Sequence, residues 1–121
     1  MAATIEIYTD GSCSGNPGPG GWAAVLTTPS GQKQISGGEK STTTNRMELM
    51  AAIKGLESTP LSSSVEIHSD SEYLVKTMTL GWKRRVTHDL WEQLDRLASE
   101  RDVKWLWVKG HAGDPRNEQA D

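Results

Sequence analysis

The sequence contains little cysteine, no long apolar stretch and no excess of basic residues, and each shortage excludes a class of protein. Cys13 is the only cysteine, so an intrachain disulfide is impossible and a structural zinc site would lack thiolate ligands. No apolar run approaches the roughly 20 residues that span a bilayer. The first residues, MAATIEIYTDG, begin a strand pattern without the basic and apolar regions of a signal peptide. We therefore expect a cytoplasmic protein with no membrane partner.

The charge balance argues mildly against a protein that binds nucleic acid. The chain has 13 Lys and Arg against 16 Asp and Glu, a formal net charge of −3, whereas nucleic-acid binders usually carry a basic surface. The only dense basic cluster, residues 83–85 after Trp82, fits a solvated helix end as well as a phosphate contact. At 121 residues the chain can bury one hydrophobic core but not two, so we expect a single domain over residues 1–121.

Hydrophobic periodicity and turn residues predict three strands, a helix, a strand, two helices and a last strand. The expected strands cover residues 5–10, 22–28, 33–36, 65–70 and 103–108, and the expected helices begin at Asn45, at Ser71 and just before Leu90. Residues 11–21, rich in Gly and Pro, are expected to form a loop. Helical crossovers make strands one, four and five parallel, while the first three are antiparallel. The fold class is therefore α/β, with a five-stranded mixed sheet flanked by helices.

The last strand is apolar on both sides. Trp105 and Trp107 alternate with Leu106 and Val108, and a strand of this kind is usually covered on both faces. We expect it to be covered in this way.

Four acidic residues stand out because of their places in this pattern. Asp10 and Asp70 end strands one and four, Glu48 lies in the first turn of the first helix, and Asp121 follows the loop after strand five. The carboxyl ends of parallel strands lie at one sheet edge, where α/β proteins place ligands. Carboxylates gathered from distant segments repel one another unless divalent cations neutralise them. Two such ions roughly 3.5–4 Å apart are a known device for cutting phosphodiesters.

Each of these carboxylates also has a purely structural interpretation. Asn45 and Glu48 have the spacing of a helix capping box. Asp70 could cap the helix that begins at Ser71, Asp10 could be a turn aspartate before a glycine, and Asp121 could be a solvated helix residue. Taken singly, each structural interpretation is the commoner one; the flanking residues favour the metal site.

Four sequence motifs, DGSCSGNPGPGGW, TNRMEL, SDSEYL and KGHAGDPRNEQAD, resemble those of ribonuclease H type 1. The resemblance runs from Thr9 to the last residue. Such long, ordered motifs are far more specific than a lone glycine motif. The resemblance implies the RNase H-like fold and an endonuclease that hydrolyses the RNA strand of RNA–DNA hybrids. It further implies 5′-phosphate and 3′-hydroxyl ends and a monomer.

By matching motif positions, the resemblance assigns the site. Asp10, Glu48, Asp70 and Asp121 would hold two Mg²⁺ ions, for which Mn²⁺ is a possible substitute, and Asp10 would bridge them. His111, in a loop between Gly110 and Gly113, would act in proton transfer or product release. The implied substrate contacts are Gly11, Cys13, Asn16 and Ser71 to the RNA strand, Asn45 to bases, Thr43 to a DNA phosphate and Trp82 to the DNA backbone.

The chain departs from the family pattern in three ways. Only a short basic segment, residues 81–85, replaces the longer protrusion of many bacterial relatives, so we expect weaker hybrid binding with a shallower salt dependence. Thr44 and Glu72 replace a common asparagine and a common glutamine. The sequence also stops at Asp121, where relatives continue into another helix, so part of one sheet face, including one side of the last strand, is expected to be exposed.

Two other functions are compatible with the same motifs. One is a different nuclease on the same architecture, such as a junction resolvase or the nuclease region of a reverse transcriptase. The other is a hybrid-binding module without catalysis, although the presence of all four carboxylates argues against it.

Overall fold

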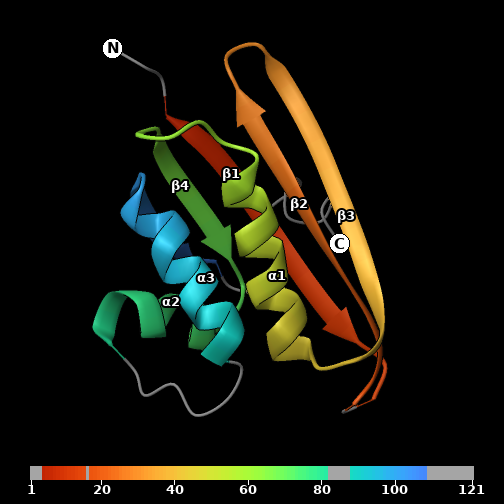
Figure 1. Ribbon diagram of the computed structural model, residues 1–121. Helices are drawn as coiled ribbons and strands as arrows, with labels where there is room; N and C mark the ends of the chain where they lie inside the picture. Colours follow the sequence, from red (N-terminus) through yellow and green to blue (C-terminus); the bar gives the residue numbers. More distant parts are fainter. Residues whose placement is uncertain (1–3, 16, 82–87, 109–121) are drawn as a thin grey trace.

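The five strands form one mixed sheet in the order β3-β2-β1-β4-β5, and Figure 1 shows β4, β1, β2 and β3 side by side. The sequence predicts the mixed sheet and its antiparallel and parallel pairs, but not this order. The computed structural model describes residues 4–15, 17–81 and 88–108. Strands β1, β2 and β3 are antiparallel neighbours, whereas β4 pairs in parallel with β1 and β5. The elements in chain order are β1 (Ile5–Cys13), β2 (Gly18–Thr28), β3 (Gly31–Thr42), α1 (Thr44–Glu57), β4 (Ser64–Ser69), α2 (Glu72–Leu80), α3 (His88–Ser99) and β5 (Asp102–Trp107).

The first two strands are longer than the sequence predicts, and the expected loop over residues 11–21 is wrong at both ends. Strand β1 continues to Cys13, which pairs with Gly20 of β2. A Cβ atom at Gly20 would lie 2.7 Å from the carbonyl oxygen of Ser12 and 2.6 Å from the Thr42 methyl group. Glycine is used here because backbone and side chains of the neighbouring strands approach closely, and not because the chain turns.

Strand β3 also extends beyond the expected residues 33–36, through two consecutive glycines. A Cβ atom at Gly37 would lie 2.7–2.9 Å from atoms of the Trp22 indole, which therefore lies against the glycine backbone on the neighbouring strand. Glycines weaken a strand in isolation, so the sequence pattern gives no sign of a strand here. The packed indole is the tertiary contact that accounts for the glycine.

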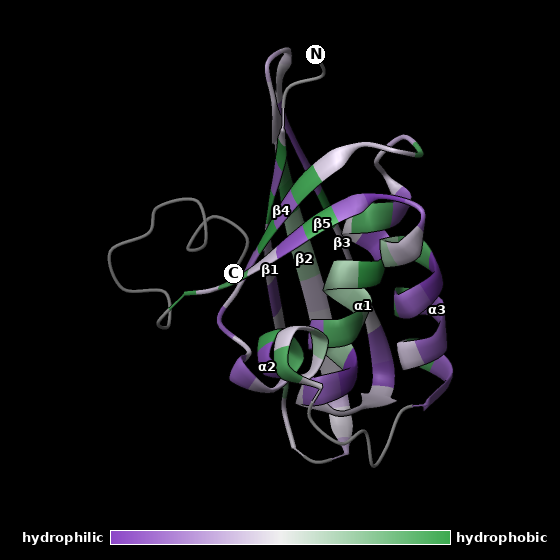
Figure 2. Ribbon diagram, turned by 90° about the vertical axis from the view of Figure 1, so that its left-hand side faces the viewer, coloured by the Kyte–Doolittle hydropathy of each residue, from purple (hydrophilic) through white to green (hydrophobic). Residues whose placement is uncertain are grey.

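The main core lies between the sheet and the helices, on one face of the sheet (Figure 2). Helix α1 packs across β1 and β2, and α3 packs beside α1. The buried residues of this core are Ile7, Ala24, Leu26, Leu49, Ala52, Ile53, Leu56, Val65, Ile67, Leu74, Leu90, Trp91, Leu94 and Leu97. On the other face, Tyr8, Ala23 and Val25 form a small second cluster. None of the helices in the described residues has the length and apolarity to cross a bilayer.

For the described residues, one face of β5 is covered at Trp105 and partly open at Trp107. The two indoles are two residues apart and lie on the same face of the strand. Trp105 packs against the main core, but Trp107, at the end of the strand, is 47% exposed. The expectation that β5 is covered on both faces is therefore wrong at the end of the strand.

Truncation of a core leucine in α3 should cost far more stability than truncation of an exposed one. Leu94 is fully buried, whereas Leu61 is 67% exposed. We expect Leu94→Ala to lower the free energy of unfolding by roughly 2–5 kcal/mol, through lost burial and a residual cavity. Leu61→Ala should stay within about 0.5 kcal/mol of the parent. Urea titration followed by circular dichroism measures both, and equal losses would contradict the assigned core.

Candidate active site at the carboxyl end of the central strands

Parallel pairing places Asp10 and Asp70 beside each other. Thr9 of β1 is in register with Ser69 of β4, and the two aspartates are the next residue on each chain. Neighbouring strands lie about 4.8 Å apart. Asp10 is 7% exposed and pairs with Ala23 of β2, so it belongs to the strand and is not a turn residue.

Helix α1 brings Glu48 to the same place. A Cβ atom at Gly11 would lie 2.4 Å from the backbone nitrogen of Glu48 and 2.5 Å from the carbonyl carbon of Met47. The first turns of α1 therefore touch the backbone of β1 immediately after Asp10. Only glycine permits this approach, because no neighbouring side chain can move aside to relieve a clash with backbone atoms.

The electrostatics of Glu48 show that it faces Asp70. Burial, and next the negative charge of Asp70, raise the pKa of Glu48 from 4.5 to about 7, while a hydrogen bond from the Ser71 hydroxyl opposes this rise. The structure thus places Asp10, Glu48 and Asp70 at one sheet edge, although the ligand atoms of these three described residues do not all lie within 4.8 Å of one another. A carboxylate whose ionisation is suppressed by burial and by a second carboxylate is a suitable ligand for a divalent cation, which relieves both penalties.

The structural interpretations of two carboxylates are wrong. The N-cap of α1 is Thr43, whose side chain accepts a hydrogen bond from the Arg46 backbone N–H at 3.2 Å. Helix α1 therefore begins one residue earlier than predicted, and Glu48 lies too far along it for a capping box. The N-cap of α2 is Ser71, which accepts from the Leu74 N–H at 3.1 Å. Asp70 precedes the cap and does not form it.

Five of the expected substrate contacts lie among the described residues. Gly11 and Ser71 adjoin the carboxylates, as described above. Thr43 is half-buried at the start of α1, and Asn45 is exposed one residue into it. The Cys13 thiol is directed at main-chain carbonyls, with its sulfur 3.3 Å from the Gly18 oxygen and 3.1 Å from the Thr42 oxygen. The other expected site residues, Asn16, Trp82, His111 and Asp121, lie outside the described residues.

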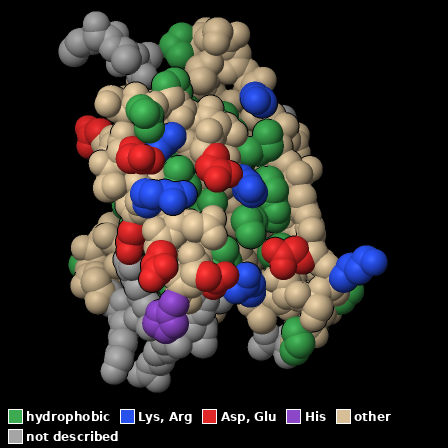
Figure 3. Space-filling view, in the orientation of Figure 1, with side chains coloured by type: hydrophobic (Ala, Val, Ile, Leu, Met, Phe, Trp, Pro, Cys, Tyr) green, Lys and Arg blue, Asp and Glu red, His purple; other side chains and the backbone are tan. Residues whose placement is uncertain are grey.

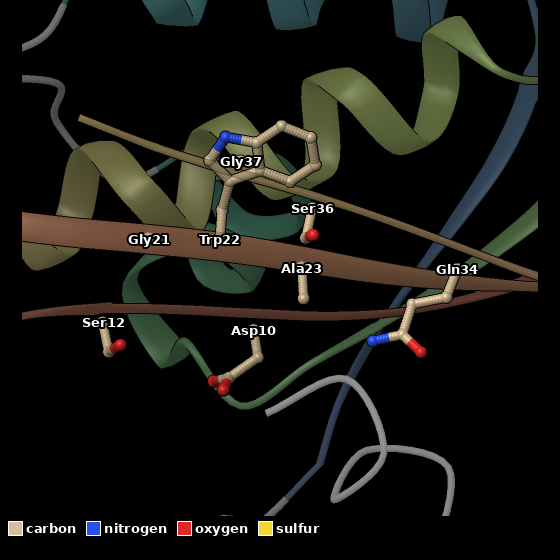
Figure 4. A pocket seen from close by; sticks show the side chains of 8 residues that line it. All are labelled: Asp10, Ser12, Gly21, Trp22, Ala23, Gln34, Ser36 and Gly37. Atoms are coloured by element: carbon tan, nitrogen blue, oxygen red, sulfur yellow. The ribbon is translucent and has the colours of Figure 1, made fainter.

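A polar pocket of about 290 Å³ opens beside Asp10 on the sheet face away from α1 (Figure 4). Asp10, Ser12, Gln34 and Ser36 supply polar side chains to it, and Ala23 lies between them. The Trp22 indole points to the other side of β2. The sequence reasoning missed this pocket because it depends on the pairing of β2 with β3.

A second acidic group on the same sheet face was also missed. Glu6, Glu66 and His68 each offer a ligand atom, and these atoms lie within 4.8 Å of one another. Glu6 is in register with Glu66, and Tyr8 with His68, whose rings stack with centroids 4.2 Å apart. The alternation of side chains along β1 and β4 could have revealed this group, but only once the strand register was known.

Comparison with known proteins decides the family. A sequence profile of the RNase H family matches residues 2–121. The chain belongs to the RNase H family. The expected resemblance is confirmed, and as an RNase H the chain is an endoribonuclease.

Curated and solved relatives agree with this family. Ribonuclease H of Paramagnetospirillum magneticum is 50% identical over 98% of this chain and 85% of the relative. Ribonuclease HI of Caulobacter vibrioides is 49% identical over 100% of this chain and 90% of the relative. LC9-RNase H1, described as a type 1 RNase H with the type 2 active-site motif, superposes with a TM-score of 0.83 at 30% identity, covering 99% of this chain and 69% of that one.

The contact at Gly11 predicts a sharp effect of one added methyl group. We expect Gly11→Ala to lower the free energy of unfolding by about 3 kcal/mol or more, at or above the usual upper range for overpacking, because it meets backbone and not a movable side chain. Ser12→Ala, one residue later, is the control and should change stability little. Chemical denaturation measures both, and a fully stable Gly11→Ala variant would contradict the contact.

The raised pKa of Glu48 predicts that its ionised carboxylate destabilises the metal-free protein at high pH. The folded protein holds the Glu48 proton up to about pH 7, whereas the unfolded chain releases it near pH 4.5. The contribution of Glu48 to the free energy of unfolding is therefore at its maximum below pH 4.5, and it is lost as the pH rises to 7. With a chelator present, Glu48→Gln should raise the melting temperature by roughly 2–6 °C at pH 8 and leave it nearly unchanged at pH 4. An equal shift at both pH values would refute the suppressed ionisation.

Proposed function

We propose that this chain is a single-domain, metal-dependent endoribonuclease that hydrolyses the RNA strand of RNA–DNA hybrids. The observation that carries the proposal is the meeting of Asp10, Glu48 and Asp70 at one sheet edge in a chain of the RNase H family. One solved relative, LC11-RNase H1, was crystallised in complex with an RNA/DNA hybrid. It superposes with a TM-score of 0.80 at 25% identity, over 96% of this chain and 92% of that one.

The described carboxylates suit hard divalent cations. Oxygen ligands are those that Mg²⁺ prefers, and the suppressed ionisation of Glu48 is a cost that a cation would remove. We assign metal ligation to Asp10, Glu48 and Asp70, together with Asp121 outside the described residues. A pair of Mg²⁺ ions held there, or Mn²⁺ in their place, would supply activation of water and stabilisation of the departing 3′ oxygen, and cleavage would leave 5′-phosphate and 3′-hydroxyl ends.

The residues around the carboxylates would recognise the RNA strand. A-like helices present their 2′-hydroxyl groups in a wide, shallow minor groove. Gly11 lies beside Asp10 and lets α1 approach it, and Ser71 holds a hydroxyl beside Glu48. Since the Cys13 thiol is directed at the Gly18 and Thr42 carbonyls, we assign the contact at this residue to its backbone.

The remaining assignments rest on the family resemblance. Asn45 would contact bases, Thr43 would hold a DNA phosphate and Trp82 would lie against the DNA backbone. Asn16 would contact the RNA strand, and His111 would move a proton or assist product release. An imidazole suits that role because its usual pKa of about 6.5 allows both donation and acceptance near neutral pH.

The surface on the helix side fits modest hybrid affinity. Acidic and basic side chains are interspersed over this side of the molecule (Figure 3), and the net charge is −3. Binding of nucleic acid scales with the number of phosphates that basic groups neutralise. We therefore assign catalytic competence mainly to the carboxylate site and not to a broad basic surface.

Neutralisation of one site carboxylate should abolish cleavage, whereas neutralisation of a carboxylate from the second acidic group should not. We expect Asp10→Asn to lower the rate on an RNA–DNA hybrid with Mg²⁺ by more than about a hundredfold, since even residues behind metal ligands cost up to that much. Glu6→Gln, on the same strand and face, should keep most of the activity. Cleavage of end-labelled hybrid measures both, and the reverse order would move the metal site to Glu6.

Substrate preference separates the proposal from the two competing functions. Wild-type protein should cut the hybrid and leave a four-way junction and double-stranded RNA intact. Preferential cleavage of the junction would indicate a resolvase. Tight hybrid binding without turnover, even at high Mg²⁺ or Mn²⁺, would indicate a binding module.

A further inference from the structure

We infer that Trp107 is a positioning residue that fixes the orientation of the metal ligand Asp70, an inference that rests on the proposed function. Asp70 is the single residue between the end of β4 and the N-cap of α2. Residues 69–71, here called the Asp70 turn, carry the carboxylate of Asp70 and the hydroxyl that meets Glu48. The conformation of this turn therefore sets the positions of the Asp70 carboxylate and the Ser71 hydroxyl relative to Glu48.

The main-chain ladder between β4 and β5 ends just before Asp70. Ser69 is in register with Trp107, and the last backbone contact is from the Val108 N–H to the Ser69 carbonyl at 2.9 Å. The Asp70 carbonyl lies beyond this ladder, and it also precedes the first carbonyl of the helix, since Ser71 is the residue that accepts from Val75. The Trp107 indole Nε1–H donates to this Asp70 carbonyl at 3.3 Å. A side chain thus extends the pairing of the two strands by one residue.

The same peptide group is held from its other side. The Ser71 backbone N–H donates to the Ser69 hydroxyl at 3.1 Å in a buried position. The Asp70 carbonyl and the Ser71 N–H belong to one planar peptide unit. Trp107 and Ser69 therefore bond to the two polar groups of this planar peptide unit. The orientation of the unit sets the direction of the Asp70 side chain and of the Ser71 hydroxyl.

The exposure of Trp107 supports a role other than core packing. Its side chain is 47% exposed, and the Lys76 ammonium group of α2 lies 5.7 Å from the ring centroid. Trp105, two residues earlier on the same face of β5, packs against the main core instead. The covered half of the indole contributes ordinary burial, but burial does not explain the direction of its N–H, which donates to the Asp70 carbonyl of the turn.

The test compares Trp107→Phe with Trp105→Phe. The first keeps a ring for Lys76 but removes the N–H that reaches Asp70; the second changes a tryptophan of the same strand away from the turn. Mn²⁺ binding to metal-free protein is measured by titration calorimetry, and hybrid cleavage is measured over a range of Mn²⁺ concentrations. We expect Trp107→Phe to weaken Mn²⁺ binding about tenfold, the usual cost of losing a group that orients a ligand.

The cleavage data separate positioning from structural damage and from substrate contact. The KM of Trp107→Phe for hybrid should stay within about twofold of wild type, and its rate should recover at high Mn²⁺, because only the metal affinity has changed. Equal Mn²⁺ affinity in the two phenylalanine variants would overturn the inference. A raised KM for hybrid without a change in Mn²⁺ binding would overturn it as well.

A second variant tests the same peptide unit independently. Ser69→Ala removes the acceptor for the Ser71 N–H and should also weaken Mn²⁺ binding several-fold. If Trp107→Phe does not fold, this variant decides alone, and unchanged Mn²⁺ affinity would overturn the inference. If wild-type protein neither binds Mn²⁺ nor cuts hybrid, the proposed function fails, and that result is distinct from a failure of the inference alone.

Discussion

The parallel pairing of β1 with β4 is the constraint on which the site depends. It ends at Thr9 and Ser69, and it delivers an aspartate from each strand to the same edge of the sheet. The absence of a side chain at Gly11 then lets α1 touch the next residue of β1 and brings Glu48 to the same edge. Contacts between backbone atoms of β1, β4 and α1 therefore place three carboxylates from distant segments at the same edge.

Short polar side chains cap the helix ends at this edge of the sheet. Ser69 and Ser71 satisfy backbone N–H groups at the start of α2, and Thr43 does so at the start of α1. Both helices thus begin beside the carboxylates with capped ends, and their N-terminal partial positive charges lie near the negative groups. Burial, and next the repulsion by Asp70, still raise the pKa of Glu48.

The sequence predicts the mixed sheet, its parallel and antiparallel pairs and the starts of α1 and α2 to within one residue, because period-two and helical spacing report directly on burial. It fails where tertiary contacts decide. The glycines at 20 and 37 predict a break in a strand, yet they lie inside β2 and β3 because Ser12, Thr42 and Trp22 occupy the space that a side chain would need. Trp107 lies on the same face of β5 as Trp105, and only its place at the end of the strand distinguishes the two. The motifs of the carboxylates identify the family, but the second acidic group required the register of β1 with β4.

The second acidic group lies close to the carboxylate site along the open face of the sheet. Its His68 is in register with Tyr8, against which it stacks, and Tyr8 is two residues, about 7 Å along the strand, from Asp10. That distance is within the Debye length of about 8 Å at physiological ionic strength, and a nearly buried group such as Asp10 is screened even less. A cation captured by Glu66 and His68 would therefore change the electrostatic field at Asp10.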